Sequence, residues 1–435
     1  MIRSNNSALF KLPVKSSTLR LTALTALLLT LVLSVPSGRA SVDTPLVSTA
    51  TRAGRLAVFD DAWETIAIRY YDSSFHGVDW QKQRAVFRTA AAQANTTEEF
   101  YRLLRQMISS LRDPHTRIYS PKEKFDWWNP KFISIGVTVR EVEGVPTVMA
   151  LEKHSAPARA GLKPGDVILK VHDSPVNTLV DHHFSGSARF RAVANLLEGA
   201  AGSKVELLWQ DEQGKTHSGS FPRYWSQREL GFGIRHDRGL AIIHIDAFTQ
   251  TIATDLLSAL PARLKHVRGI VLDLRSNGGG DAEAMASIAS AFLPNETKLG
   301  RFADRSSASF ELETSSKGLW RPALASPTKL PLVVLTGEGT SSAAEILAAA
   351  LQKQRRAKIV GTDTCGCVLA IRSRHALPDG GVLDVSEFDY RTAEGRRLEG
   401  DGVHPDQIVE PKRRDVYRRF DKATEIAKAL VRSQL

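Results

Sequence analysis

Hydrophobic positions recur at helical spacing near the start of the chain. Apolar residues three and four apart predict an amphipathic helix over residues 55–71. A second helix is predicted from Thr96, because Thr96 and Glu99 have the spacing of a capping box, and it should stop before Pro114. We therefore expect residues 55–125 to form a small helical cap.

The pattern then changes to short apolar runs separated by turn residues, which predicts a β-rich domain over residues 131–222. From about residue 230, buried-type strands alternate with helical stretches, which favours an α/β core over residues 230–435. The fold class expected is therefore multidomain α/β. The predicted strands are 132–140, 146–151, 166–171, 204–209, 240–248, 269–274, 330–336, 358–361 and 382–390, and a helix is predicted over 342–354.

Residues 1–40 have the order of a secretory signal peptide: a basic region, an apolar run over residues 21–35, and small residues before a cut after Ala40. The apolar run is shorter than the roughly 20 residues that span a bilayer. We expect cleavage and export to the periplasm or medium, without stable membrane insertion. The alternative is an uncleaved inner-membrane anchor formed by residues 21–35.

Composition excludes several classes of protein. The hydrophobic fraction of 42% and charged fraction of 24% are those of a globular protein. The formal charge is +11, but residues 1–40 contain five basic and no acidic residues, so the remainder carries a mild +6. No nucleic-acid partner is expected. Two cysteines cannot form a disulfide framework.

Two glycine-rich segments could carry chemistry. In Gly337–Ile346 a strand ends in a turn and a helix starts at a serine, where free N–H groups can stabilise an oxyanion. On this segment alone, Ser341 or Ser342 could equally be a plain helix cap. In Asp273–Gly280, three glycines follow a buried strand and allow a close backbone approach. The segments lack the G-x-S-x-G elbow and the P-loop lysine.

Taken together, these segments resemble the C-terminal-processing and tricorn-type serine peptidases. Five stretches match the family's motifs in the same order over most of the chain: Leu111–Thr116, Ser155–Asp166, Asp273–Gly280, Gly339–Ile346 and Glu399–Asp406. The resemblance implies a helical cap, a PDZ domain over residues 131–222 and a peptidase core. It also implies hydrolysis of peptide bonds in protein or peptide substrates, without metal or cofactor, and it leaves the oligomeric state open.

The same resemblance assigns roles to residues. Ser342, three residues before a glutamate, matches the nucleophile that forms an acyl-enzyme. The Ser-Lys branch has a lysine 25 residues later, where this chain has Cys367. The tricorn branch uses a histidine and a glutamate instead, which match His115 and Glu399. Histidine can take the serine proton, and a carboxylate can orient it. The oxyanion would be bound by the N–H groups of Ala343 and of Gly279 or Gly278.

Each role has an alternative. His115 could belong to a turn made with Asp113, and Glu399 could be a surface residue paired with Arg396 or Arg397. The whole chain could be a catalytically silent PDZ scaffold that binds exposed chain ends. It could also be a serine peptidase with another lysine, such as Lys358, as base.

Two further features remain open at this stage. Ile135, Gly136 and Val137 lie where the family has its carboxylate-binding loop, so they are the predicted substrate-capturing residues, unless the PDZ domain is purely structural. Cys365 and Cys367 are too few to hold zinc. We expect two buried thiols beside the active site, with a disulfide as the alternative.

Overall fold

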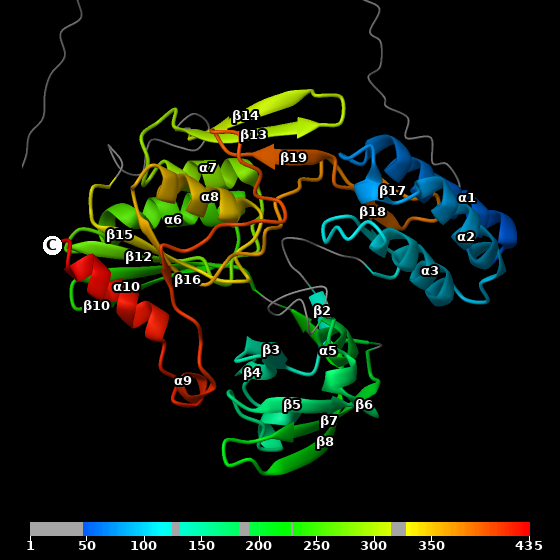
Figure 1. Ribbon diagram of the computed structural model, residues 1–435, viewed down its shortest axis with the longest axis horizontal. Coiled ribbons are helices and arrows are strands. Elements are labelled where there is room, and N and C mark those ends of the chain that lie inside the picture. Colours follow the sequence, from blue (N-terminus) through cyan, green and yellow to red (C-terminus); the bar gives the residue numbers. More distant parts are fainter. Residues whose placement is uncertain (1–46, 124–130, 182–190, 200, 228, 315–327) are drawn as a thin grey trace, which may run out of the picture. The chain divides into compact units, whose positions relative to one another are not determined.

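The computed structural model describes residues 47–123, 131–181, 191–199, 201–227, 229–314 and 328–435 (Figure 1). The predicted signal peptide lies outside these residues, so its cleavage stays a prediction. Within the described ranges, no helix combines the length and the apolar character that crossing a bilayer requires.

Three helices open the described chain: α1 (Arg52–Arg69), α2 (Trp80–Gln93) and α3 (Thr97–Ser109), with a 3-10 turn η1 (Phe75–Gly77) after α1. Thr96 caps α3 as predicted, and its hydroxyl accepts from the Glu99 N–H at 3.0 Å. The Glu99 carboxylate accepts from the Asn95 N–H instead of completing the box. Helix α2 was not predicted, because it buries only Trp80, Ala91 and Ala92 and so lacks a continuous apolar stripe.

A part of the chain far away in sequence completes the hydrophobic core beneath these helices. The strand β1 (Arg117–Tyr119) pairs with β18 (Val382–Asp384), which pairs with β17 (His375–Ala376). Leu377, Leu383 and Val385 pack into the same apolar cluster as the side chains of α1 and α3. The helical unit is therefore not formed by residues 55–125 alone.

The β-rich region forms one sheet with the strand order β3-β4-β5-β7-β8, in which β3 is an edge strand. The predicted strand 132–140 is broken at Gly136, whose φ of +77° ends the extended chain. A separate pair, β2 and β9, connects this region to the rest of the chain. The elements are β2 (Lys131–Ser134), β3 (Val137–Val142), β4 (Val145–Leu151), α4 (Ala156–Arg159), β5 (Val167–Val171), β6 (Ser174–Pro175), η2 (Val176–Thr178), α5 (Arg191–Leu197), β7 (Lys204–Gln210), β8 (Thr216–Pro222) and β9 (Tyr224–Gln227).

The α/β core is built on a six-stranded sheet with the order β10-β11-β12-β15-β16-β20. All pairs in it are parallel except β10 with β11. The predicted strand 382–390 is divided between two other sheets, as β18 and β19. The remaining elements are β10 (Phe232–Asp237), β11 (Leu240–Ile245), α6 (Gln250–Arg263), β12 (Gly269–Asp273), α7 (Ala282–Ala289), β13 (Lys298–Asp304), β14 (Ser309–Glu313), β15 (Leu332–Thr336), α8 (Ala343–Lys353), β16 (Lys358–Gly361), β19 (Phe388–Arg391), β20 (Gln407–Ile408), α9 (Arg413–Tyr417) and α10 (Lys422–Arg432).

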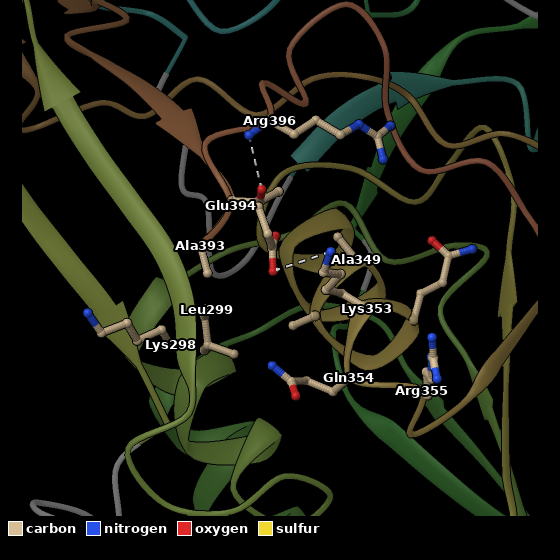
Figure 2. Close-up of a pocket in the computed structure, with 12 residues that line it drawn as sticks. Lys298, Leu299, Ala349, Lys353, Gln354, Arg355, Ala393, Glu394 and Arg396 are labelled. Carbon is tan, nitrogen blue, oxygen red and sulfur yellow. Dashed lines mark hydrogen bonds and ion pairs between the residues drawn. The ribbon is translucent and has the colours of Figure 1, made fainter.

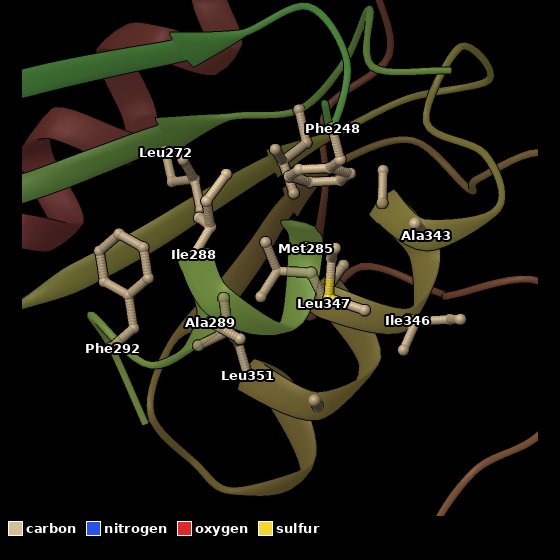
Figure 3. Close-up of a cluster of buried hydrophobic side chains, with 14 of the residues drawn as sticks. Phe248, Leu272, Met285, Ile288, Ala289, Phe292, Ala343, Ile346, Leu347 and Leu351 are labelled. Carbon is tan, nitrogen blue, oxygen red and sulfur yellow. The ribbon is translucent and has the colours of Figure 1, made fainter. Parts of the chain in front are cut away.

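Alternate side chains of the strands face opposite sides of this sheet, and each side is covered by helices. Ala241 and Ile243 pack with α6, α7 and α8. Figure 3 shows buried side chains of α7 and α8 facing one another, among them Met285 and Leu347. Leu240 and Ile242 pack with α10 on the other side. Because β12, β15 and β16 are parallel, the loops that follow them all leave the sheet at the carboxyl ends of the strands. In such folds, ligand-binding and active sites lie at this edge of the sheet. These loops contain the glycine-rich segments predicted above.

Candidate active site

Ser342 lies at the junction between the loop after β15 and helix α8. It is the N-cap of α8, and its φ of +56° and ψ of −124° are unusual for a residue with a side chain. Such a conformation costs about 1–3 kcal/mol and persists only where neighbours enforce it. The preceding turn is pinned by Thr340, whose hydroxyl donates to the Leu274 carbonyl at 2.8 Å and accepts from the Gly337 N–H at 3.1 Å.

The loop after β12 packs directly against Ser342. A Cβ added to Gly279 would lie 2.6 Å from the Ser342 Cβ and 3.1 Å from the Ala343 nitrogen, so only glycine fits here. The Gly279 N–H donates to Asn277 Oδ1 at 2.8 Å, and the Ser341 N–H donates to the Asn277 carbonyl at 3.0 Å. The structure therefore brings the two glycine-rich segments together, as predicted.

Two N–H groups near Ser342 have no acceptor within the described residues. Ala343 is the first residue of α8, so its N–H has no partner in the helix. The Gly278 N–H likewise donates to no described atom. Of the predicted oxyanion donors, Gly278 and Ala343 thus present free N–H groups, whereas that of Gly279 is engaged by Asn277.

The buried carboxylate of Glu345 holds the surroundings of Ser342. One oxygen accepts from Thr364 Oγ1 at 2.5 Å and from the Gly366 N–H at 2.7 Å. The other accepts from the N–H groups of Ser342 at 2.9 Å and Cys367 at 3.0 Å. Burial raises the pKa of Glu345, and these four donors act in the opposite direction. In the sequence, Glu345 stands out only by its spacing from Ser342, which is also that of a capping box.

Cys365 and Cys367 form a disulfide in the loop after β16, with Cα atoms 5.2 Å apart. The expectation of two buried thiols was therefore wrong, and Cys365 is in fact exposed. The Cys367 carbonyl accepts from the Ser342 N–H at 2.9 Å. The position at which the Ser-Lys branch has its lysine thus lies beside Ser342 and carries half of a cystine.

Glu399 is hydrogen-bonded to the same loop after β16, one residue beyond Cys367. Its Oε2 accepts from the Val368 N–H at 2.5 Å. Burial raises the pKa of Glu399, while the Val368 N–H and the nearby charge of His115 lower it. Arg397 donates to Asp389 and Arg396 donates to Asp401, so neither arginine is hydrogen-bonded to Glu399.

His115 lies between α3 and β1 with 15% of its side chain exposed. The carboxylate nearest to its ring is that of Asp113, at 3.6 Å from Nδ1, and Asp113 also accepts from the His115 N–H at 2.8 Å. Burial alone would raise the pKa of Asp113, but His115, Ser386 and Thr116 together lower it. No hydrogen bond between described residues joins His115 to Ser342 or to Glu399. Asp113 was considered in the sequence only as part of a turn.

The other predicted positions are only partly suited to their roles. The side chain of Ile135 is buried in the core of the β-rich region. The Gly136 N–H donates to Ser134 Oγ at 2.8 Å, and its carbonyl accepts from the Glu152 N–H. Val137 begins the edge strand β3. Lys358 begins β16 and pairs with Val333, at the opposite end of the strands from Ser342, so the structure does not bring it to the site.

A cleft of about 490 Å³ lies at the far end of α8 (Figure 2). Lys353 of α8 reaches toward Glu394 there, with 3.9 Å between the charged groups. None of the predicted site residues lines this cleft. The candidate site is instead the junction of the three loops at the sheet edge.

Two regions of the chain match models of known protein families. Residues 239–409 match the model described as Peptidase family S41, and residues 51–109 match that of the tricorn protease C1 domain. The chain therefore contains an S41 peptidase domain and a tricorn C1 domain, and it is a serine-type peptidase. Its curated relatives include carboxyl-terminal-processing peptidases.

Two of these relatives illustrate the extent of the match. The chloroplastic carboxyl-terminal-processing peptidase 2 of Arabidopsis thaliana is 29% identical over 375 residues, which cover 80% of this chain and 68% of that protein. The carboxy-terminal processing protease CtpA of Bacillus subtilis (strain 168) is 28% identical over 306 residues, which cover 69% and 62%.

Solved structures support the fold. The photosystem II D1 C-terminal processing protease matches with a TM-score of 0.54 and 24% identity, covering 82% of this chain and 93% of that one. Mature CPAF matches with a TM-score of 0.66 and 12% identity, covering 87% and 96%. The mixed α/β fold with a helical N-terminal region is thus shared with processing proteases.

Proposed function

We propose that the chain is an exported endopeptidase that cleaves peptide bonds through an acyl-enzyme on Ser342. The observation that carries this proposal is the contact of Gly279 with Ser342 and Ala343, which leaves no room for a side chain. Ser342 is held at φ +56° at the start of a helix, with a glycine loop against it. In the proposal, the free N–H groups of Ala343 and Gly278 bind the oxygen of the carbonyl group that its hydroxyl attacks.

The oxyanion donors in this proposal are the N–H groups of Ala343 and Gly278. When the Ser342 oxygen attacks a peptide carbonyl, the carbonyl oxygen gains a negative charge that these donors can bind. We favour Gly278 over Gly279, because the Gly279 N–H already donates to Asn277 Oδ1. Losing one such donor costs enzymes about 10²–10³ in turnover.

His115 is proposed as the general base. It would accept the Ser342 proton during attack and return it to the leaving amine, after which a water would be deprotonated in the same way to release the acyl group. Glu399 is proposed as the carboxylate that stabilises the protonated ring, because it matches the glutamate of the tricorn branch and is hydrogen-bonded to the loop that also contacts Ser342. Asp113, 3.6 Å from Nδ1, would help to fix the orientation of the ring.

The β-rich region is proposed as a PDZ domain that captures the substrate. An extended chain end could add to the outer edge of β3, whose only partner in the described sheet is β4. Because the Ile135 side chain is buried and both backbone groups of Gly136 are already hydrogen-bonded, Val137 would begin the pairing with the substrate. Unstructured protein ends in the periplasm or medium are the substrate class that this arrangement fits.

Labelling with a serine-reactive fluorophosphonate tests the mechanism. Wild-type protein should label, whereas Ser342→Ala and His115→Ala should not. The variant Lys358→Ala serves as the control, because Lys358 lies at the opposite edge of the sheet. Folded wild-type protein that does not label, or a His115→Ala variant that labels normally, would contradict the proposal. In the first case, the silent-scaffold alternative gains support.

A further inference from the structure

The disulfide Cys365–Cys367 spans a single residue in a loop that contacts both proposed reacting elements. The Cys367 carbonyl accepts from the Ser342 N–H at 2.9 Å. One residue later, the Val368 N–H donates to Glu399 at 2.5 Å. The Gly366 carbonyl accepts from the Gly400 N–H at 2.8 Å. The backbone of residues 366–368 therefore connects the nucleophile to the segment that carries Glu399.

The shape of this loop matters for these contacts. The N–H groups of Gly366 and Cys367 converge on the Glu345 carboxylate, which also accepts from the Ser342 N–H. Such convergence requires an unusual backbone turn, and Gly366 has a φ of +66°. A bond between the side chains on either side of Gly366 restricts the loop to conformations of this kind. Without that bond, three residues regain conformational freedom.

The disulfide is also open to attack from solvent. Cys365 is exposed and Cys367 is partly buried. Exposed disulfides are the ones that exchange readily with thiols, whereas buried structural ones resist reduction. The chain contains two cysteines, so any effect of a thiol reductant on it arises at this loop.

On the basis of the proposed function, we propose that the Cys365–Cys367 disulfide positions Ser342 and Glu399 for catalysis, and that its reduction by a dithiol switches the peptidase to a low-turnover state. A thiolate of the dithiol attacks the Cys365 sulfur and breaks the cystine bond, and Cys367 leaves as a thiolate that takes up a proton. The second thiol of the reductant then closes its own disulfide and releases Cys365. Two electrons pass from the dithiol to the cystine.

The expected consequence is a loss of turnover with little change in substrate binding. The loop touches the nucleophile and the acid, and the β-rich region proposed to capture substrate lies elsewhere in the chain. Misplacing reacting groups by about 1 Å can cost about 10²-fold in rate. We expect reduction to lower kcat at least about tenfold while KM stays within about twofold.

The test compares oxidised and dithiothreitol-reduced full-length protein for kcat and KM on an unstructured peptide and for the rate of fluorophosphonate labelling. Thiol titration confirms the redox state. Turnover should fall on reduction and return when oxidised dithiothreitol is added. A Cys365→Ser/Cys367→Ser variant should have the kcat of the reduced wild type, and dithiothreitol should not change it.

Two results would overturn the inference: fully reduced wild type with unchanged kcat, or a double-serine variant as active as the oxidised protein. Ser342→Ala distinguishes this failure from failure of the proposed function. If oxidised wild type is no more active than Ser342→Ala, the nucleophile assignment is wrong and the inference falls with it. If the oxidised wild type is active and indifferent to reduction, only the role of the disulfide is refuted.

Discussion

The Ser342 N–H donates to the carboxylate of Glu345, three residues later in the same chain, at 2.9 Å. In an ordinary capping box this bond only closes the first turn of a helix. Here the same carboxylate also accepts from Thr364 and from two backbone groups of the disulfide loop. One side chain therefore fixes the backbone of the proposed nucleophile relative to the loop after the next strand.

Replacing Glu345 by glutamine should destabilise the fold and slow the reaction. The amide nitrogen of glutamine cannot accept, so two of the four donors lose their partner in a buried setting. We expect a loss of about 2–4 kcal/mol in the free energy of unfolding, and labelling of Ser342 slower by at least about tenfold. Urea unfolding and labelling rates measure these effects, with the exposed Glu394→Gln as the matched control. Equal stability of the two variants would contradict the role of Glu345.

Gly279 and Gly278 form a matched pair for testing the glycine loop. A Cβ at Gly279 would lie 2.8 Å from the Ser341 carbonyl oxygen, and its φ is +91°, whereas a Cβ at Gly278 meets nothing closer than Ser341 Oγ at 4.0 Å. Gly279→Ala should therefore lose about 10²-fold or more in peptidase activity, because the loop must move away from Ser342. Gly278→Ala keeps its N–H and should stay within about threefold of wild type. Peptide hydrolysis checks both, and similar losses in the two variants would contradict this geometry.

Glu399 and Asp113 should affect the pH profile differently. Burial raises the pKa of Glu399 above that of an ordinary glutamate. If the reaction requires the ionised carboxylate, activity should fall as the pH drops through this raised pKa. The pKa of Asp113 is lowered, so Asp113 stays ionised over the same range. Glu399→Gln should lower kcat/KM and remove this acidic step from the profile. Asp113→Asn should lower kcat/KM by a factor that does not vary with pH above 5.

The measurement is kcat/KM on a peptide between pH 4.5 and 8 for both variants and wild type. An acidic limb unchanged in Glu399→Gln would show that Glu399 does not ionise in the rate-determining pathway. A full wild-type rate in Asp113→Asn would show that the ring of His115 needs no support from this carboxylate.

The link between Arg275 and Asp421 should make stability depend on pH. Arg275 donates to both Asp421 oxygens, at 2.9 and 2.8 Å, and lowers the pKa of Asp421 to about 2, against the effect of burial. A carboxyl group whose pKa is lower in the folded than in the unfolded state stabilises the fold at pH values above its unfolded pKa of 3.8. This stabilisation is lost as the pH falls toward 2. Because the Asp421 side chain is 46% exposed, solvent screening reduces it to about 1 kcal/mol.

Asp421→Asn should therefore unfold at lower urea concentration than wild type at pH 7, and the two curves should converge as the pH approaches 2. The exposed Asp255→Asn is the control, since the Asp255 side chain takes part in no hydrogen bond or ion pair within the described residues. A difference between Asp421→Asn and wild type that stays constant with pH would refute the charged link.

Local patterns predicted the elements around the site well. The segment from β15 to α8 combines a run with β-branched residues, which favours a strand, glycines, which favour a turn, and a serine, which favours the start of a helix. The cap of α3 at Thr96 follows from two residues and was found at the predicted position. The edge of the sheet at which the loops meet follows from parallel pairing, which the strand and helix alternation already favoured.

Long-range relationships could not be predicted in this way. Nothing local indicates that Leu383 and Val385 complete a core with helices α1 and α3, which lie far earlier in the chain. The partner of a buried carboxylate is equally hidden, so Glu345 was not recognised as the centre of a network. The disulfide was only the alternative to two buried thiols, because spacing alone does not tell whether two cysteines face each other.

The short span of the cystine has a consequence for how the protein matures. With two cysteines in the chain, only one intramolecular pairing exists, and it closes a ring around a single glycine. The oxidation requires no distant segments to meet, so it does not have to wait until the rest of the fold has formed. No wrong isomer within one chain has to be reshuffled afterwards. Air oxidation of the denatured, reduced chain at high dilution should thus return the native cystine without a disulfide isomerase.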